Sequence, residues 1–218
     1  MMSDAPAHHL FCLLGPVDPN RKTLPEVLVI IQVCLEGEIS KSTVVEGISR
    51  GKRASGDLIP WTVSQQYQDP DFPRLSGARI VRIATHPDYQ GMGYGAKALS
   101  ILKQYYEFKI PSTDESEDTV EEISNVAEDE VGLLEETIEP RKNLPPLLLK
   151  LSDRPPEKLD YLGVSYGVTE QLLKFWKRAG YVPVYLRQTT NDLTGEHSCI
   201  MLNVLNNDDN NDDWLLAY

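Results

Sequence analysis

The stretch Ile83–Ala96 constrains this chain most strongly, because it places glycines at alternate positions between a strand pattern and a helix pattern. It reads IATHPDYQGMGYGA: an alternating apolar segment, a His-Pro turn, and then Gly91, Gly93 and Gly95 at the start of an amphipathic helix. Glycines at such a turn let backbone N–H groups point inward and keep side chains away from a bulky anion. A helix N-terminus adds unpaired donors and partial positive charge, so the stretch predicts a pyrophosphate site.

The glycine spacing differs from that of two other nucleotide loops. A dinucleotide-binding fingerprint is Gly-x-Gly-x-x-Gly with a suitably placed acid downstream, whereas this chain has Gly-x-Gly-x-Gly and no such acid. A P-loop requires Gly-Lys-Ser or Gly-Lys-Thr, which the chain lacks. The order of strand, proline and Gln-Gly-x-Gly-x-Gly resembles the pyrophosphate loop of GNAT acetyltransferases. A glycine-rich turn without a ligand is the alternative.

The remaining patterns alternate between strand and helix. Apolar runs predict strands at 27–35, 79–85, 159–166, 181–187 and 197–204, the last two forming a hairpin. Helices are predicted at 41–49, from Gly93 onward, and from the cap Thr169 to Arg178, with Gly180 just past the end. Residues 57–73 predict an irregular connection. This order favours an α/β fold with a mixed central sheet and flanking helices.

Charge divides the chain into a core and acidic segments. Residues 112–139 hold twelve Asp or Glu and no Lys or Arg, and the tail 206–218 begins NNDDNNDD. Without the acids of these two segments the chain has 17 acids against 21 bases, a net charge of +4 in place of −12. An acidic partner such as RNA is therefore not excluded. We expect an N-terminal extension (1–19), one domain formed by 20–111 and 140–205, a disordered insert at 112–139 and an acidic tail.

Neither a membrane segment nor a metal site is expected. The early apolar run 10–14 is too short for a signal-peptide core or a membrane span. Cys12, Cys34 and Cys199 form no Cys-x-x-Cys pair and have no metal-ligand spacing. We expect buried, reduced thiols and therefore a reducing compartment, the cytosol or the nucleus.

Longer sequence blocks are more specific than the glycine loop. The blocks RIVRIATHPDYQGMGYGAKAL, LPPLLLKL, LDYLGVSYGVT, LLKFWKRAGYVPVYLRQT and NDLTGEHSCIML resemble the acetyltransferase domain of the RNA cytidine acetyltransferases, in their eukaryotic branch. The resemblance covers nearly all of residues 20–205 outside the acidic insert. It implies a GNAT fold, a nuclear and nucleolar location, and transfer of acetyl from acetyl-CoA to the exocyclic amine of cytidine in rRNA and tRNA, assisted by ATP.

The resemblance also implies a set of contact residues. The family's acetyl-CoA contacts fall on eleven positions of this chain: Ile83, Ala84, Thr85, Gln90, Gly91, Met92, Gly93, Tyr94, Gly95, Ala96 and Arg178. Relatives can carry Val at position 85 and Ser at position 96, but both contacts would be made largely by the backbone. In GNAT folds the thioester lies in a notch where two strands splay apart. Family members also carry an ATPase/helicase module and an RNA-binding tail, whereas this chain has no ATP site of its own.

Acetyl transfer to cytidine requires a polarised thioester and a group that takes a proton. Backbone N–H groups near Ile83–Thr85 are the candidate oxyanion donors. His86 is the candidate proton acceptor, because it leaves the strand at the expected notch and histidine titrates near neutral pH. A structural turn residue is the alternative for His86, and Glu196 with His197 forms a second candidate pair.

Two other functions remain open at the level of sequence. One is a GNAT enzyme that acetylates protein lysines or N-terminal amines, which the glycine loop fits equally well. The other is a non-catalytic CoA-binding module in ribosome biogenesis, which the three intact glycines disfavour. The basic residues Arg50, Lys52 and Arg53 are candidates for contacts with RNA phosphates.

Overall fold

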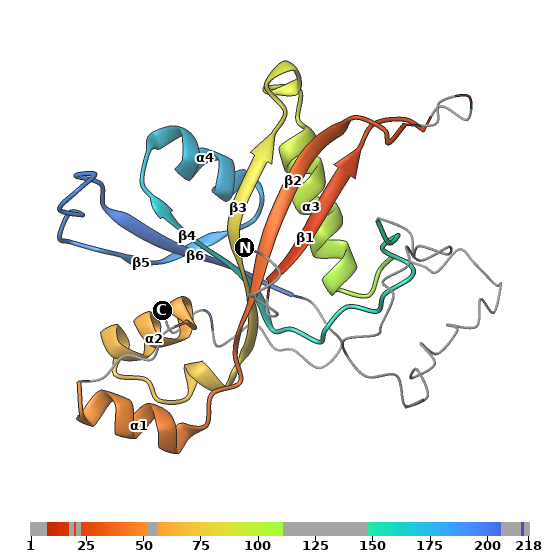
Figure 1. Cartoon of the computed structure of the whole chain (residues 1–218). Helices are drawn as coiled ribbons and strands as arrows, with labels where there is room; N and C mark the ends of the chain where they lie inside the picture. The colour runs from red at the N-terminus through yellow and green to blue at the C-terminus, as the bar shows by residue number, and fades with distance from the viewer. Residues whose placement is uncertain are drawn as a thin grey trace, which may run out of the picture. The chain divides into compact units, whose positions relative to one another are not determined.

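The computed structural model describes residues 8–17, 20, 23–51, 56–110, 148–205 and 215 (Figure 1). The chain divides into two compact units, one formed by 1–109 with 156–218 and the other by 110–155. In the second unit, Asp153 N donates to Lys150 O at 3.1 Å and closes a turn. The acidic insert, and the acidic tail except for Leu215, lie outside the described residues. Within the described ranges, no helix combines the length and apolar character that a membrane span requires.

The first unit is built on a six-stranded sheet in the order β1-β2-β3-β4-β6-β5. Among the strand pairs in the described part of the chain, only β3 and β4 run parallel, and α3 connects them as a parallel crossover requires. The five predicted strands are confirmed, with ends that differ by a few residues. The strands are β1 (His8–Leu14), β2 (Val27–Gly37), β3 (Ser76–Thr85), β4 (Tyr161–Gly167), β5 (Val182–Leu186) and β6 (Ser198–Val204).

Strand β1 is an additional edge strand. The expectation that residues 1–19 form an extension outside the domain is wrong for residues 8–14, which pair antiparallel with β2. Phe11 packs edge-on against Tyr105 and Tyr106 of α3, with ring centroids 5.6 and 6.1 Å apart. The short apolar run therefore extends the sheet beneath this helix.

The connection between β2 and β3 is helical. The predicted helix α1 (Lys41–Ser49) is confirmed, whereas the irregular connection predicted for 57–73 is wrong. That segment contains α2 (Leu58–Tyr67) and a 3-10 turn, η2 (Phe72–Arg74). Pro60 indicated a loop, but it lies in the first turn of α2, where a backbone N–H has no intrahelical partner to lose.

The two faces of the sheet carry different helices. On one face, α2 and η2 pack on β4, β5 and β6 through a core of Ile59, Val63, Phe72, Tyr161, Val184, Ile200 and Leu202. On the other face lie α3 (Tyr94–Tyr106) and α4 (Glu170–Arg178). The predicted caps of α4 are confirmed: Thr169 Oγ1 accepts from Leu172 N at 3.2 Å, and Gly180 has a φ of 85°.

Strands β3 and β4 pair only along their first halves. Their last partners are Ile80 and Val164, after which β3 continues to Thr85 and β4 to Gly167. At the same point Val81 is an extra residue of β3 relative to β2, a bulge that bends the strand. The strands then diverge, β3 toward the glycine loop and β4 toward α4 (Figure 1). We call this break in pairing, between residues 81–85 and 165–167, the notch.

Candidate functional site

The backbone of β3 directs alternate peptide groups into the notch. His86 N donates to Leu28 O of β2 at 2.8 Å, so the peptide groups of Ala84, two residues earlier, also face β2. Ile83 and Thr85 alternate with them and face the opposite side, where β4 no longer pairs. Of the three predicted contact residues in this strand, Ile83 and Thr85 offer backbone groups to the notch, and Ala84 does not.

The segment between β3 and α3 is a compact turn. It contains the 3-10 helix η3 (Pro87–Tyr89), and Gln90 Nε2 folds back to donate to Thr85 O at 3.3 Å. Tyr89 donates from its hydroxyl to Glu26 Oε2 at 2.6 Å, and this hydrogen bond raises the pKa of Tyr89. These contacts fix the turn to the chain that precedes β2 and to the end of β3.

The three glycines of the loop serve two different purposes. Gly91 and Gly93 have φ angles of 77° and 88°, a left-handed region that costs other residues about 1 to 2 kcal/mol. A Cβ at either position would meet no atom within 4 Å, so the backbone is open to approach. A Cβ on Gly95, in contrast, would lie 3.2 Å from Thr85 Oγ1 and 3.8 Å from Phe175 Cε2. Gly95 therefore allows α3 to pack closely on β3 and α4. This corrects the expectation that all three glycines keep side chains away from an anion.

The N-terminus of α3 carries free backbone donors. Lys97 N donates to Gly93 O at 3.0 Å, so the amides of Tyr94, Gly95 and Ala96 precede the helical hydrogen bonds. The cap residue Gly93 has no side chain that could accept from them, and the first turn carries no acidic residue. An uncapped helix start beside an open glycine turn is suited to a phosphate group.

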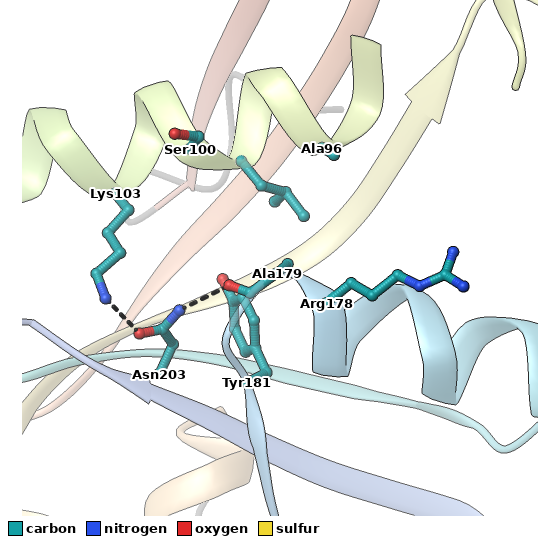
Figure 2. Close-up of a pocket in the computed structure, with 8 residues that line it drawn as sticks. Ala96, Ser100, Lys103, Arg178, Ala179, Tyr181 and Asn203 are labelled. Carbon is teal, nitrogen blue, oxygen red and sulfur yellow. Dashed lines mark hydrogen bonds between the residues drawn. The ribbon is translucent and has the colours of Figure 1, made fainter. Parts of the chain in front are cut away.

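Arg178 ends α4 and lines a pocket of about 240 Å³ between α3 and the C-terminus of α4 (Figure 2). The predicted residues Ala96 and Arg178 thus line one pocket, and the Arg178 side chain extends away from Lys103 and Asn203. Lys103 lies one turn beyond Ser100 on the pocket side of α3, which the helical period could have indicated. Asn203 lies in an apolar strand pattern that gives no such signal. The full lining is Ala96, Leu99, Ser100, Lys103, Arg178, Ala179, Tyr181 and Asn203.

His86 occupies the turn on the β2 side of β3. Its Nδ1 accepts from Asp88 N at 3.3 Å, and its ring centroid lies 5.6 Å from that of Tyr89. A neutral imidazole that accepts at Nδ1 carries its proton on Nε2, which is then a donor. This geometry favours the structural role of a turn residue, and proton acceptance would require His86 to give up the bond with Asp88.

The second candidate pair, Glu196 and His197, is divided between two sites. His197 Nδ1 contacts Arg187 O at 2.9 Å, next to β5. Glu196 instead places its carboxylate over Gly167, the last residue of β4, at the rim of the notch.

Tyr166 is a notch residue that sequence reasoning missed. It follows the last β3–β4 pair, packs on Trp176 of α4 with ring centroids 6.1 Å apart, and donates to Met201 Sδ at 3.0 Å. Burial raises the pKa of Tyr166 to about 12, so the phenol stays protonated at neutral pH. Of the three cysteines expected to be buried thiols, Cys199 is buried, and burial raises the pKa of its thiol, whereas Cys12 and Cys34 are only half-buried.

Comparison with known families bears on the predicted fold and family. A family model described as GNAT acetyltransferase 2 matches residues 1–206. The chain belongs to the GNAT acetyltransferase 2 family. Its mixed six-stranded sheet with flanking helices is the GNAT fold, which confirms the predicted fold class.

The relatives of this GNAT acetyltransferase 2 chain confirm the predicted resemblance. Along its whole length the chain is 66% identical to the RNA cytidine acetyltransferase of Homo sapiens and 55% identical to that of Saccharomyces cerevisiae. It spans 22% of the human protein and 21% of the yeast protein. The chain also matches a solved structure of Arabidopsis thaliana NAA60 in complex with acetyl-CoA. The match covers 92% of this chain and 77% of the NAA60 chain, with 8% sequence identity and a TM-score of 0.45.

Proposed function

We propose that this chain binds acetyl-CoA and transfers its acetyl group to the exocyclic amine of cytidine in rRNA and tRNA. The observation that carries the donor half is the open, left-handed backbone at Gly91 and Gly93, beside the uncapped start of α3 and the notch. The acceptor half rests on 66% identity to a protein named RNA cytidine acetyltransferase.

In this proposal the donor is held mainly by backbone groups. The pyrophosphate accepts hydrogen bonds from the amides between Gly91 and Ala96, where the helix start adds partial positive charge. Arg178, exposed at the end of α4, donates to a further phosphate from the side of the pocket. The pantetheine arm lies along the free edge of β3 and pairs with the peptide groups of Ile83 and Thr85, as a neighbouring strand would.

The same edge supplies the stabilisation of the reaction. An N–H group of Ile83 or Thr85 directed at the thioester oxygen stabilises the charge that develops there, and one such donor contributes about 100- to 1,000-fold in rate. The acceptor amine of cytidine is neutral, so it needs no prior deprotonation but must lose a proton as the new bond forms. His86 is the acceptor proposed from sequence, after release of its Nδ1 from Asp88.

The RNA is expected to meet other parts of the full-length protein as well. On this chain, the exposed Arg50 at the end of α1 pairs with Glu46 at 2.7 Å and is available to phosphate, whereas Lys52 and Arg53 lie outside the described residues. We propose that an ATPase/helicase module and an RNA-binding module, supplied elsewhere in the full-length protein, present the RNA. We also propose a nuclear, nucleolar location, where rRNA is modified.

Radiolabelled acetyl-CoA offered to RNA, histones and free peptides tests the proposal. We expect the full-length protein to label RNA, with the label recovered as N4-acetylcytidine. Label in histones or peptides alone would replace the RNA substrate with a protein amine. Binding of acetyl-CoA without any transfer would support the non-catalytic module.

A further inference from the structure

Glu196 lies at the rim of the notch, directly over the end of β4. A Cβ on Gly167 would overlap with Oε2 and Cδ of Glu196 and would lie 3.2 Å from its Cβ. Gly167 is not among the residues with a positive φ, so its backbone does not require glycine. What the missing side chain provides is room for the Glu196 carboxylate.

Backbone hydrogen bonds on both sides fix the position of Glu196. Asn191 N donates to Glu196 O at 2.9 Å, and Val168 N donates to the carbonyl of the next residue, His197, at 2.8 Å. Within the described part of the chain, the carboxylate of Glu196 has neither a hydrogen-bond nor an ion-pair partner. Glu196 is exposed, and in this part of the chain its charge makes no interaction that stabilises the fold.

The carboxylate faces the side of the sheet opposite the proposed donor site. Side chains alternate along a strand, so odd and even residues of β4 face opposite sides. A Cβ on Gly163 would lie against Ile59 of α2, whereas Tyr166 packs on α4. Gly167 and the Glu196 above it therefore share the α2 face, while the glycine loop and the pocket are formed by α3 and α4. A donor held there leaves the α2 face of the notch open to an acceptor.

We propose that Glu196 contacts the acceptor amine and takes its proton, an inference that rests on the proposed acetyl transfer. The amine lone pair attacks the thioester carbon, and the carbonyl π electrons move onto the oxygen. The N–H proton passes to the Glu196 carboxylate. The oxyanion then re-forms the carbonyl and expels the CoA thiolate, which takes up a proton from solvent while protonated Glu196 releases its proton to solvent, so the products are the N-acetylated acceptor and CoA. Among the described residues the Glu196 carboxylate has no hydrogen bond to break first, whereas His86 must release its bond with Asp88.

The decisive variant is Glu196→Gln, which preserves shape but cannot accept a proton. In the full-length protein we expect kcat for cytidine acetylation, measured by nucleoside mass spectrometry, to fall by about 100-fold or more. Affinity for acetyl-CoA, measured by calorimetry, should not change, because the carboxylate lies on the other face. Asp192→Asn, an exposed carboxylate on the same β5–β6 connection, is the matched control and should retain full activity.

A second variant tests the placement of the carboxylate. Gly167→Ala should displace it and lower kcat while acetyl-CoA binding persists, and Glu196→Asp should recover part of the activity that the glutamine variant loses. If Glu196→Gln and Asp192→Asn acetylate cytidine in RNA with the same kcat, the role assigned to Glu196 is wrong while the proposed function stands. If the wild-type protein labels only peptides, the proposed substrate fails, and the effect of Glu196→Gln on that reaction still decides its role.

Discussion

Lys103 donates from Nζ to Asn203 Oδ1 at 2.8 Å and thereby joins α3 to β6 across the pocket that Arg178 lines (Figure 2). The same amide donates from Nδ2 to Ala179 O at 3.1 Å, on the residue that follows Arg178. Asn203 is only 5% exposed, and a Cβ on Gly180 would lie 3.3 Å from its Nδ2. One buried amide thus sets the end of α4 relative to α3, and with it the position of Arg178.

Replacing Asn203 with leucine should weaken both the fold and the donor site. The substitution leaves the carbonyl of Ala179 and the ammonium of Lys103 without this partner, at a cost of about 1 to 3 kcal/mol in unfolding free energy. Acetyl-CoA affinity should also fall, because Arg178 loses its anchor. Chemical denaturation and calorimetry measure the two effects. Ser100 lies in the same pocket and, among the described residues, has no bond to another element, so Ser100→Ala should show neither effect. Equal behaviour of the two variants would contradict the bridging role.

Gly93→Asp should abolish acetyl-CoA binding, while Gly93→Ala should only weaken it. Both variants strain a backbone at φ 88°, at about 1 to 2 kcal/mol. Aspartate adds a carboxylate next to the pyrophosphate, where like charges a few ångström apart repel strongly in a partly desolvated site. Calorimetry measures the acetyl-CoA affinity of variants that still melt cooperatively. Because both variants share the backbone strain, the difference between their affinities gives the effect of the added charge. Equal affinities of the aspartate and alanine variants for acetyl-CoA would show that the pyrophosphate does not bind at this loop.

Elements specified by neighbouring residues were predictable from sequence. The caps of α4 follow from local signals, Thr169 at its start and Gly180 past its end. The turn at Gly91 and Gly93 was predictable for the same reason, because its left-handed backbone lies in one contiguous stretch. Strand β1 was missed because its pairing with β2 and its packing beneath α3 are long-range. Helix α2 was missed because Pro60 indicates a loop unless the helix start is known.

The parts of the site that depend on strand pairing could not be read from the sequence. Whether Ala84 or Ile83 faces the notch depends on the register with β2 and on the bulge at Val81. The face on which Glu196 lies depends on its contact with Gly167, which is distant in the sequence. Asn203 has no sequence signal because its partners come from two different helices.

Glu36 of β2 and Arg79 of β3 form an ion pair in the part of the sheet where β3 and β4 pair. We expect this ion pair to make a large contribution to the unfolding free energy. The Glu36 side chain is 1% exposed and accepts from Arg79 Nε through Oε1 and from Ile59 N through Oε2 at 3.1 Å, which ties β2, β3 and α2 together. Glu36→Gln leaves the guanidinium without its counter-charge and should cost about 3 kcal/mol in unfolding free energy.

The exposed pair of Arg50 and Glu46 supplies the control for that measurement. Its N–O distance is 2.7 Å, but both side chains are more than half exposed. Glu46→Gln should therefore cost at most about 1 kcal/mol. Urea unfolding of both variants gives the comparison, and similar costs would show that burial of Glu36 contributes little.

The last prediction concerns RNA, and it separates binding of the donor from modification of the acceptor. This chain alone should bind acetyl-CoA but acetylate structured RNA far more slowly than the full-length protein. Outside its acidic segments it carries 21 bases against 17 acids, which supports only a few phosphate contacts and an affinity that falls steeply with salt. A paired cytidine must also leave its helix before its amine can reach the notch, at a cost of about a few kcal/mol.

Comparison of two RNAs distinguishes these two causes. If exposure of the base limits the reaction, a short single-stranded RNA should narrow the difference between the chain and the full-length protein, because no pairing has to be broken. If phosphate contacts limit it, lowering the salt concentration should narrow the difference for both RNAs. Reverse-transcription mismatch or nucleoside mass spectrometry measures the product. Rates on structured RNA that equal those of the full-length protein, without ATP, would show that the described notch and its surroundings present the cytidine unaided.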